Sequence, residues 1–405
     1  MNPNLARLHP YPFERWRELT GDIVAPRGLS AIGLGIGEPK HATPELIRRA
    51  MVDHLEGLSS YPATSGQPAL RETIAQWVAR RYDVVVDPAT QVLPVGGSRE
   101  ALFALAQTVV DASRPGATVL CPNPFYQIYE GAALLAGAQV AFVNSDPSRR
   151  HAANWDQVGD DVWARTQLLY VCSPGNPTGA VMPLAEWQRL FELSDRHGFV
   201  IASDECYSEI YFGDEAPLGS LQAARQLGRS DFTGLIALTS LSKRSNVPGM
   251  RSGFVAGDAA LIRQFLLYRT YHGSAMSPVV QHASMAAWSD ERHVQANREL
   301  YRTKFAQVTP VLARVMDVAL PDAGFYLWAD VSRLGLGDDI AFARALLAQY
   351  NVTVLPGSLL ARPAHGVNPG AGRIRLALVA PVDECLQAAH RIASFVNARH
   401  QTSLP

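Results

Sequence analysis

The sequence has few residues of the kinds that bind metals or cross-link a fold. Its 405 residues include four cysteines without CxxC-type spacing, and neither an HxxxH pair nor a histidine–cysteine cluster occurs. A metal site and a disulfide framework are therefore not expected. We interpret the cysteines as reduced core thiols, which are typical of a cytoplasmic protein.

Long apolar runs and an excess of one charge are also missing. No uninterrupted apolar stretch is long enough to cross a bilayer, and residues 1–16 lack the apolar region of a signal peptide. The formal net charge of −1 gives no electrostatic reason to expect nucleic acid or an anionic membrane as a partner. A chain of this length, with 47% hydrophobic and 18% charged residues, is expected to form more than one globular domain.

Short apolar runs alternate with helical periodicity through the middle of the chain. A helix is predicted over 184–196, where Leu190 and Leu193 share a face and Gly198 follows as a stop signal. Continuous apolar strands separated by helices indicate a mostly parallel sheet covered on both faces. The predicted strands are 118–121, 140–144, 168–172, 199–203, 235–239 and 253–256.

The C-terminal part of the sequence has a different pattern. One or two long helices are predicted over 284–315, followed by strands at 324–329 and 372–378 and a helix near 382–398. We expect an α/β fold in three parts. These are an N-terminal segment (1–46) that joins the small domain, a large cofactor-binding domain (47–285) and a small α+β domain (286–405).

The apolar run 235–239 is followed by Ser240-Leu241-Ser242 and then by Lys243. An ammonium at the end of a buried strand loses hydration, so such a lysine either pairs with an acid or sheds its proton and becomes a nucleophile. Ser240, Ser242 and Arg251 supply two hydroxyls and a bidentate cation, which suit a phosphate-sized anion. A nucleophilic amine beside such an anion site predicts a Schiff base to pyridoxal phosphate.

Polar residues follow three of the predicted strands. Asn176, Asp204 with Tyr207, and Lys243 each come after a strand end, where ligands of open parallel sheets bind. Asp204 would pair with the protonated pyridine nitrogen and keep the ring an electron sink. Asn176 and Tyr207 would donate to the phenolate oxygen of the ring. Each of these three residues also has an ordinary structural alternative: a helix N-cap for Asp204, a turn for Asn176 and core packing for Tyr207.

A second anion cradle is predicted upstream. A Gly-Gly pair leads through Ser98 and Arg99 into a helical stretch at 101–110. Free backbone N–H groups and the positive end of a helix dipole favour an anion there, so we assign Ser98 and Arg99 to the cofactor, although any capped helix has this pattern. Tyr126 would stack on the pyridine face; the alternative is a loop aromatic.

Arg375 lies inside the apolar strand predicted over 372–378. A buried arginine needs a carboxylate partner, and the α-carboxylate of a substrate suits its bidentate geometry. The alternative is an internal salt bridge. Gly37 would let the backbone approach the same carboxylate closely.

The motifs, taken in their order along the chain, resemble those of the class I/II aminotransferases of fold type I, which depend on pyridoxal phosphate. The matching features are Asn-Pro-Thr-Gly at 176–179, Asp204 with Tyr207, Ser-x-Ser-Lys at 240–243, Arg251 and Arg375. The resemblance covers nearly the whole chain. It implies a homodimer with active sites at the interface, in which Tyr61 reaches the phosphate bound by the partner subunit.

Within that family, residues 36–41 and 242–251 are similar to the succinyldiaminopimelate aminotransferases of proteobacterial lysine biosynthesis. Many relatives have Pro-Asp-Phe where this chain has Pro39-Lys40-His41. A cation in place of an acid suits a substrate with additional distal carboxylates, although Lys40 is otherwise a solvated surface lysine. The resemblance implies amino transfer from glutamate to N-succinyl-2-amino-6-oxopimelate, with Lys243 as the general base and acid.

Several other functions stay open. Aspartate and aromatic aminotransferases share the cofactor residues, and a cysteine-S-conjugate β-lyase uses the same scaffold. A pyridoxal-phosphate-sensing transcription regulator would need a DNA-binding module, for which the stretch before Gly37 is too short and not basic. A nucleotide-binding protein is disfavoured because the glycines at 33–37 lack GxGxxG spacing and Pro39 stands where a helix should begin.

Overall fold

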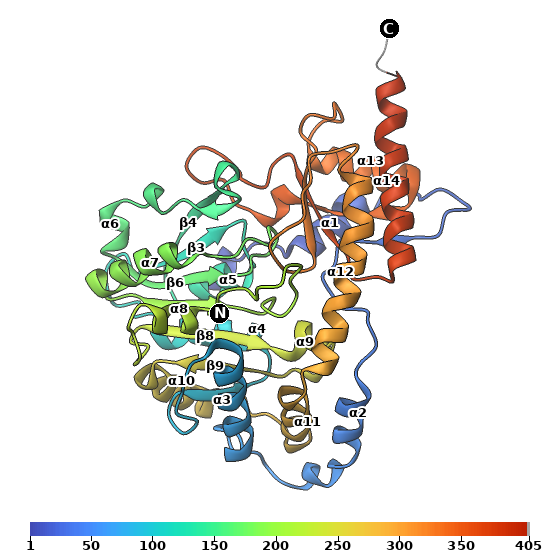
Figure 1. The fold of residues 1–405 in the computed structure, drawn as a ribbon. Helices are drawn as coiled ribbons and strands as arrows, with labels where there is room; N and C mark the ends of the chain where they lie inside the picture. Colours follow the sequence, from blue (N-terminus) through green and yellow to red (C-terminus); the bar gives the residue numbers. More distant parts are fainter. Residues whose placement is uncertain (403–405) are drawn as a thin grey trace.

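The computed structural model describes the backbone of residues 1–402 and the side chains of residues 1–398. An eight-stranded sheet forms its larger part, in the order β2-β9-β8-β7-β6-β3-β4-β5 (Figure 1). Strands β4, β3, β6, β7 and β8 run parallel, and β9 is antiparallel to both of its neighbours. The strands are β2 (Val92–Val95), β3 (Thr118–Asn123), β4 (Gln139–Asp146), β5 (Ala152–Ala153), β6 (Thr166–Cys172), β7 (Val200–Asp204), β8 (Leu235–Ser240) and β9 (Gly253–Gly257).

The sheet is buried on both faces, as its continuous apolar strands predicted. On β6, Leu168 and Tyr170 belong to one hydrophobic core, whereas Leu169 and Val171 belong to a second core on the opposite face. The first core contains α4 (Ser98–Val109), α5 (Ile128–Leu135) and α10 (Ala259–His272). The second contains α2 (Glu45–Val52), α3 (Pro68–Tyr82), α6 (Asp160–Trp163), α7 (Leu184–His197), α8 (Ser220–Gln226), α9 (Leu241–Arg244) and α11 (Pro278–Ser289). The predicted fold class is confirmed.

A smaller unit packs beside this sheet (Figure 1). It has a three-stranded sheet in the order β10-β13-β12 and a parallel pair formed by β1 and β11. Its core includes Trp16, Ile32 and Leu34, so the N-terminal segment contributes to it. The division at 46 and 285 stays a prediction. The elements are α1 (Pro12–Thr20), β1 (Ile32–Gly33), α12 (Arg292–Leu312), β10 (Tyr326–Asp330), α13 (Asp339–Tyr350), β11 (Val352–Thr353), β12 (Leu355–Pro356), β13 (Arg373–Ala377) and α14 (Val382–Thr402).

Local sequence explains where the helices begin and end. Gly198 ends α7 in the left-handed conformation, with φ of 76°, and its N–H donates to Ser194 at 2.7 Å. Asp258 caps α10 by accepting from two backbone N–H groups. The predicted helical stretch 284–315 is two helices, α11 and α12. Strand β2 was not predicted because it contains Pro94, which is tolerated since β2 lies at the edge of the sheet.

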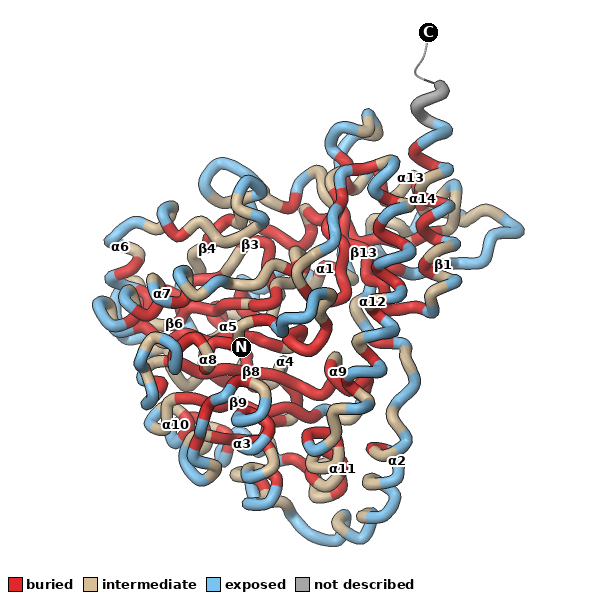
Figure 2. Tube along the Cα trace, viewed as in Figure 1, coloured by how far each residue is buried: buried red, intermediate tan, exposed pale blue. Residues whose placement is uncertain are grey.

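Burial follows this architecture (Figure 2). The strands of the sheet are red along most of their length, and exposed backbone lies mainly in the outer helices and connections. No helix in residues 1–402 is long and apolar enough to cross a membrane. Among the side chains of residues 1–398, no group of three or more His, Cys, Asp or Glu could hold a metal ion.

Candidate active site

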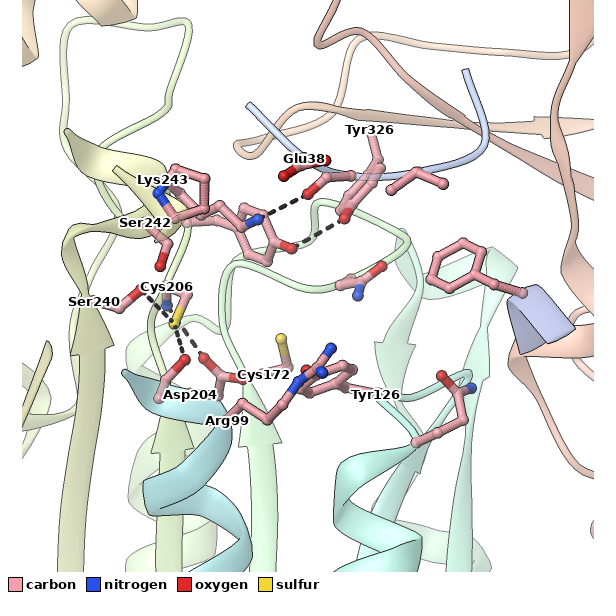
Figure 3. A pocket seen from close by; sticks show the side chains of 18 of the residues that line it. Glu38, Arg99, Tyr126, Cys172, Asp204, Cys206, Ser240, Ser242, Lys243 and Tyr326 are labelled. Atoms are coloured by element: carbon pink, nitrogen blue, oxygen red, sulfur yellow. Dashed lines mark hydrogen bonds between the residues drawn. The ribbon is translucent and has the colours of Figure 1, made fainter. Parts of the chain in front are cut away.

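A cavity of about 520 Å³ lies beyond the carboxyl ends of β6, β7 and β8 (Figure 3). Parallel strands bring their carboxyl ends to the same edge, and three of these strands deliver the polar residues predicted there. The cavity also receives residues from the start of α4, from β13 and from the N-terminal segment. The predicted residues that line it are Gly37, Ser98, Arg99, Tyr126, Asn176, Asp204, Tyr207, Ser240, Ser242, Lys243, Arg251 and Arg375.

Two predicted site residues lie elsewhere. Lys40 is not among the residues that line the cavity, and its Nζ lies 3.9 Å from the carboxylate of Glu384. Tyr61 is fully exposed and lines a different cavity, together with His54, Arg71 and His282. The structure describes a single chain, so the predicted contact of Tyr61 with a partner subunit stays a prediction.

Lys243 is partly buried at the centre of the site. Its Nζ donates to the backbone carbonyl of Gly37 at 2.8 Å, and a dashed line at Lys243 in Figure 3 marks this bond. Burial, assisted by the guanidiniums of Arg375 and Arg251, lowers the pKa of Lys243 to about 8. A substantial fraction of the amine is thus neutral near physiological pH, which a nucleophile and a proton-transfer base both require.

The lowered pKa of Lys243 predicts how fast the apoprotein takes up its cofactor at different pH values. Only the neutral amine attacks a carbonyl, so the rate of covalent attachment of pyridoxal phosphate should rise with pH and level off above a midpoint near 8. An unperturbed lysine would place that midpoint at about 10.4. Stopped-flow absorbance after mixing apoprotein with pyridoxal phosphate measures it, and a midpoint near 10 would contradict the burial argument.

Asp204 is the buried acid of the site. It is 4% exposed, accepts from the hydroxyl of Tyr129 at 2.8 Å, and accepts from the backbone N–H of Cys206 at 3.3 Å. Burial raises the pKa of Asp204, because a desolvated carboxylate is disfavoured. A cationic partner would relieve this cost, and none of the residues described by the structure forms an ion pair with Asp204 at 4 Å or less. The pyridinium of a bound cofactor is such a partner.

The anion side of the cavity is formed by the start of α4 and the loop after β8. Gly97 precedes α4 with φ of +88°, and a Cβ added there would lie 2.5 Å from a terminal nitrogen of Arg251. Glycine therefore lets the guanidinium approach the free N–H groups at the helix start. Ser98, Ser240 and Ser242 line the same region. These donors fit a phosphate group.

Arg375 is 3% exposed and makes two hydrogen bonds to neutral acceptors. One terminal nitrogen donates to Asn176 Oδ1 at 2.9 Å, and the other donates to the carbonyl of Gly35 at 2.7 Å. Its Nε is buried without a hydrogen-bond partner. Within residues 1–398, no acidic side chain pairs with Arg375 at 4 Å or less, so the internal salt bridge is not formed. The orphaned charge favours a carboxylate from a substrate.

Arg375→Ala is therefore expected to raise the KM for the amino acid substrate by roughly 10- to 100-fold, because a charge-assisted hydrogen bond contributes about 1.5–3 kcal/mol. Arg373→Ala is the matched control: this residue lies on the same strand but pairs with Asp330 at 3.3 Å. Steady-state kinetics and thermal melts of both variants test the prediction. A KM effect equal in the two variants, or a loss confined to thermal stability, would contradict it.

Some residues of the site were missed by the sequence analysis. Tyr326 and Cys206 line the cavity, and Tyr129 lies behind it, bonded to Asp204. A tyrosine inside an apolar strand, such as Tyr326, needs a partner for its hydroxyl, and this was the one available signal. The sequence does not indicate which partner that is.

The arrangement agrees with comparisons to known proteins. Residues 30–392 match the model of the family described as aminotransferase class I and II, and the chain belongs to this family. An LL-diaminopimelate aminotransferase of Nitratidesulfovibrio vulgaris (strain DSM 19637 / Miyazaki F) is 31% identical over 396 residues, which cover 96% of this chain and 98% of the relative.

Two solved structures are also similar. An aminotransferase from Neisseria meningitidis Z2491 is 54% identical, with a TM-score of 0.94, and the match covers 97% of this chain and 99% of the other. A probable N-succinyldiaminopimelate aminotransferase from Thermus thermophilus is 26% identical, with a TM-score of 0.84 over 95% and 99% of the two chains. The protein is thus a pyridoxal-phosphate-dependent transaminase.

Proposed function

We propose that this transaminase interconverts N-succinyl-2-amino-6-oxopimelate and N-succinyl-L,L-2,6-diaminopimelate, with glutamate and 2-oxoglutarate as the second pair, in lysine and diaminopimelate biosynthesis. The names of the similar proteins support the pathway. A positive charge at the cavity mouth, that of Arg99, favours the succinylated substrate.

Each cation of the cavity has a task in this proposal. Arg251 holds the cofactor phosphate, Lys243 holds the cofactor itself, and Arg375 holds the substrate α-carboxylate. Arg99, which the sequence analysis assigned to the cofactor, is assigned to the substrate in this proposal. Arg99 donates through Nε to the hydroxyl of Tyr126 at 2.7 Å. Its two terminal nitrogens have no hydrogen-bond partner among the described residues. They suit a distal carboxylate, such as that of a succinyl group.

The reaction requires removal of the Cα proton from a fixed substrate. When bound, pyridoxal phosphate supplies the carbonyl that accepts the amino group and the ring that takes up electrons. Arg375 and Asn176 orient the substrate carboxylate, which is a positioning contribution. Lys243 Nζ would serve as the base that takes the proton from Cα and as the acid that returns a proton. Asp204 would hold the protonated pyridine nitrogen, whose positive charge would favour the ionised form of the carboxylate.

Free LL-diaminopimelate is the second candidate substrate, because the similar enzyme of N. vulgaris carries that name. The distal end of the free compound carries an ammonium beside a carboxylate, whereas succinylation of that amine removes the ammonium and adds a second carboxylate. Glu38, which lines the cavity, would suit the ammonium, and Arg99 would suit the carboxylate. The two substrates therefore differ at the cavity mouth: the free compound needs an acid for its ammonium, and the succinylated compound needs more positive charge for its second carboxylate.

A half-reaction titration followed by visible absorption tests the proposal. The loaded enzyme is mixed with glutamate, N-succinyl-L,L-diaminopimelate, LL-diaminopimelate, aspartate and phenylalanine, and conversion to the aminated cofactor is measured for each. The first two donors should be the most efficient, and Arg99→Gln should weaken the succinylated donor. Preference for LL-diaminopimelate would support the second candidate. Release of pyruvate and ammonia from a cysteine conjugate would indicate a lyase.

We also propose a homodimer. Several large apolar side chains near Tyr61 are exposed in the single chain, and such a patch favours association. They are Val52 at 65%, Leu55 at 52% and Leu58 at 69%, beside Tyr61 at 104%.

A further inference from the structure

Tyr326 contacts three of the predicted site residues, although its sequence context gave it no role. It lies on β10 of the smaller unit and is 3% exposed. Its hydroxyl lies 3.1 Å from the hydroxyl of Tyr207, which follows β7 of the large sheet. Figure 3 shows this bond between the two rings at the cavity wall. The contact therefore joins the two structural units directly at the cofactor site.

The ring of Tyr326 also supports Arg375. The guanidinium carbon of Arg375 lies 4.3 Å from the ring centroid. The two residues come from the paired strands β10 and β13, on which Tyr326 is opposite Ala377 and Trp328 is opposite Arg375. An aromatic face beneath a buried guanidinium attracts it and restricts its orientation. The ring thus contributes to the placement of the group that would bind the substrate carboxylate.

The N-terminal segment passes directly over the hydroxyl of Tyr326. A Cβ added to Gly37 would overlap this oxygen, so only glycine permits the approach. The carbonyl of the same Gly37 accepts from Lys243 at 2.8 Å. Tyr326 therefore packs against the backbone group that holds the Lys243 amine.

The hydrogen bond between the hydroxyls of Tyr207 and Tyr326 can run in either direction, and its direction affects the cofactor. Tyr207 carries one hydroxyl proton, and apart from Tyr326 the titratable groups that influence it are Cys172 and Arg375. If Tyr207 gives its proton to the ring oxygen of the cofactor, its own oxygen must accept from Tyr326. We propose that Tyr326 is a positioning residue that donates to Tyr207, directs the Tyr207 proton toward bound pyridoxal phosphate, and supports Arg375 with its ring. This inference concerns the cofactor and does not depend on which substrate is correct.

Three variants of the loaded enzyme test the hydroxyl: Tyr326→Phe, Tyr207→Phe and the double variant. A donor at the ring oxygen stabilises the negative charge left when the chromophore loses its proton, so it lowers the pH midpoint of the visible absorption band. Tyr326→Phe should raise this midpoint by roughly 0.3–1 unit. If Tyr326 acts through Tyr207, the double variant should match Tyr207→Phe alone.

The outcomes separate a positioning role from a purely structural one. An unchanged midpoint in Tyr326→Phe, with or without a loss of thermal stability, would overturn the proposal, as would additive shifts in the double variant. None of these measurements uses a turnover substrate, so failure of the substrate proposal leaves the test intact.

A further variant tests the ring separately from the hydroxyl. Tyr326→Phe keeps the aromatic face beneath Arg375, whereas Tyr326→Leu removes it. Propionate, which offers a carboxylate and no amino group, is titrated against the loaded enzyme by its effect on the visible band. Its dissociation constant should stay within about twofold in Tyr326→Phe and rise roughly three- to thirtyfold in Tyr326→Leu. Equal affinity in the two variants would show that the ring does not support Arg375.

Discussion

Lys243→Ala is expected to lose the visible band of the covalently loaded enzyme and to reduce turnover by roughly 10²–10⁴-fold or more, because both the nucleophile and the proton-transfer group are removed. Noncovalent binding of pyridoxal phosphate should persist, since the phosphate donors and Asp204 remain. Absorbance after gel filtration and steady-state assays measure the two effects. Turnover near the parent level would refute the assignment of Lys243.

Lys304 offers a matched control for this substitution. It is also buried, and burial likewise lowers the pKa of Lys304 to about 8, but it donates to the carbonyl of Leu378 at 3.1 Å and does not line the cavity. Lys304→Met should therefore change thermal stability while the visible band is kept. Loss of the band in both variants would indicate that removing a buried lysine merely disrupts the fold.

Asp204→Asn is expected to have the second large effect. Removing one partner of a buried ion pair costs about 3–5 kcal/mol, which corresponds to a roughly 100- to 5000-fold loss in turnover and weaker cofactor binding. Glu205→Gln is the control, because Glu205 is also a buried carboxylate but bonds to Ser220 and Tyr82 and does not line the cavity. If Asp204→Asn kept both rate and affinity, another residue would have to pair with the pyridinium.

The same Asp204 variant should behave differently without cofactor. Burial raises the pKa of Asp204 above its unfolded value, so the stability that this group contributes is present at low pH and is lost as pH rises through the folded pKa. Asparagine does not ionise, so the apoprotein of Asp204→Asn should gain stability relative to the parent as pH increases. Thermal melts of both apoproteins across pH check the sign.

Part of this site could be predicted from the sequence because strand ends are local signals. An apolar run marks β6, β7 or β8, and the polar residues just beyond it, such as Asp204 and Lys243, must reach the same edge of a parallel sheet. Arg375 was predicted for a similar reason, since a charge inside an apolar strand demands a partner.

Other features depend on contacts between distant segments. The role of Tyr326 rests on hydroxyl and ring contacts to Tyr207 and Arg375, which no spacing in the chain indicates. Lys40 was expected near the substrate because a cation stands there in place of the acid of many relatives, but its side chain lies beside Glu384 on α14. The edge strand β2 was missed because a proline usually argues against a strand.

The pairing of the N-terminal segment has a consequence for biosynthesis of the chain. Gly35 accepts from Arg375, a residue 340 positions later, and Leu29 accepts from Asn351, 322 positions later. The ribosome makes Leu29 and Gly35 long before it makes their partners Asn351 and Arg375. The segment that contains Gly37, whose carbonyl accepts from Lys243, therefore cannot form these bonds until residues 351 and 375 have been made. The candidate active site is therefore completed only after these later residues have been made, even though Lys243 itself is made earlier.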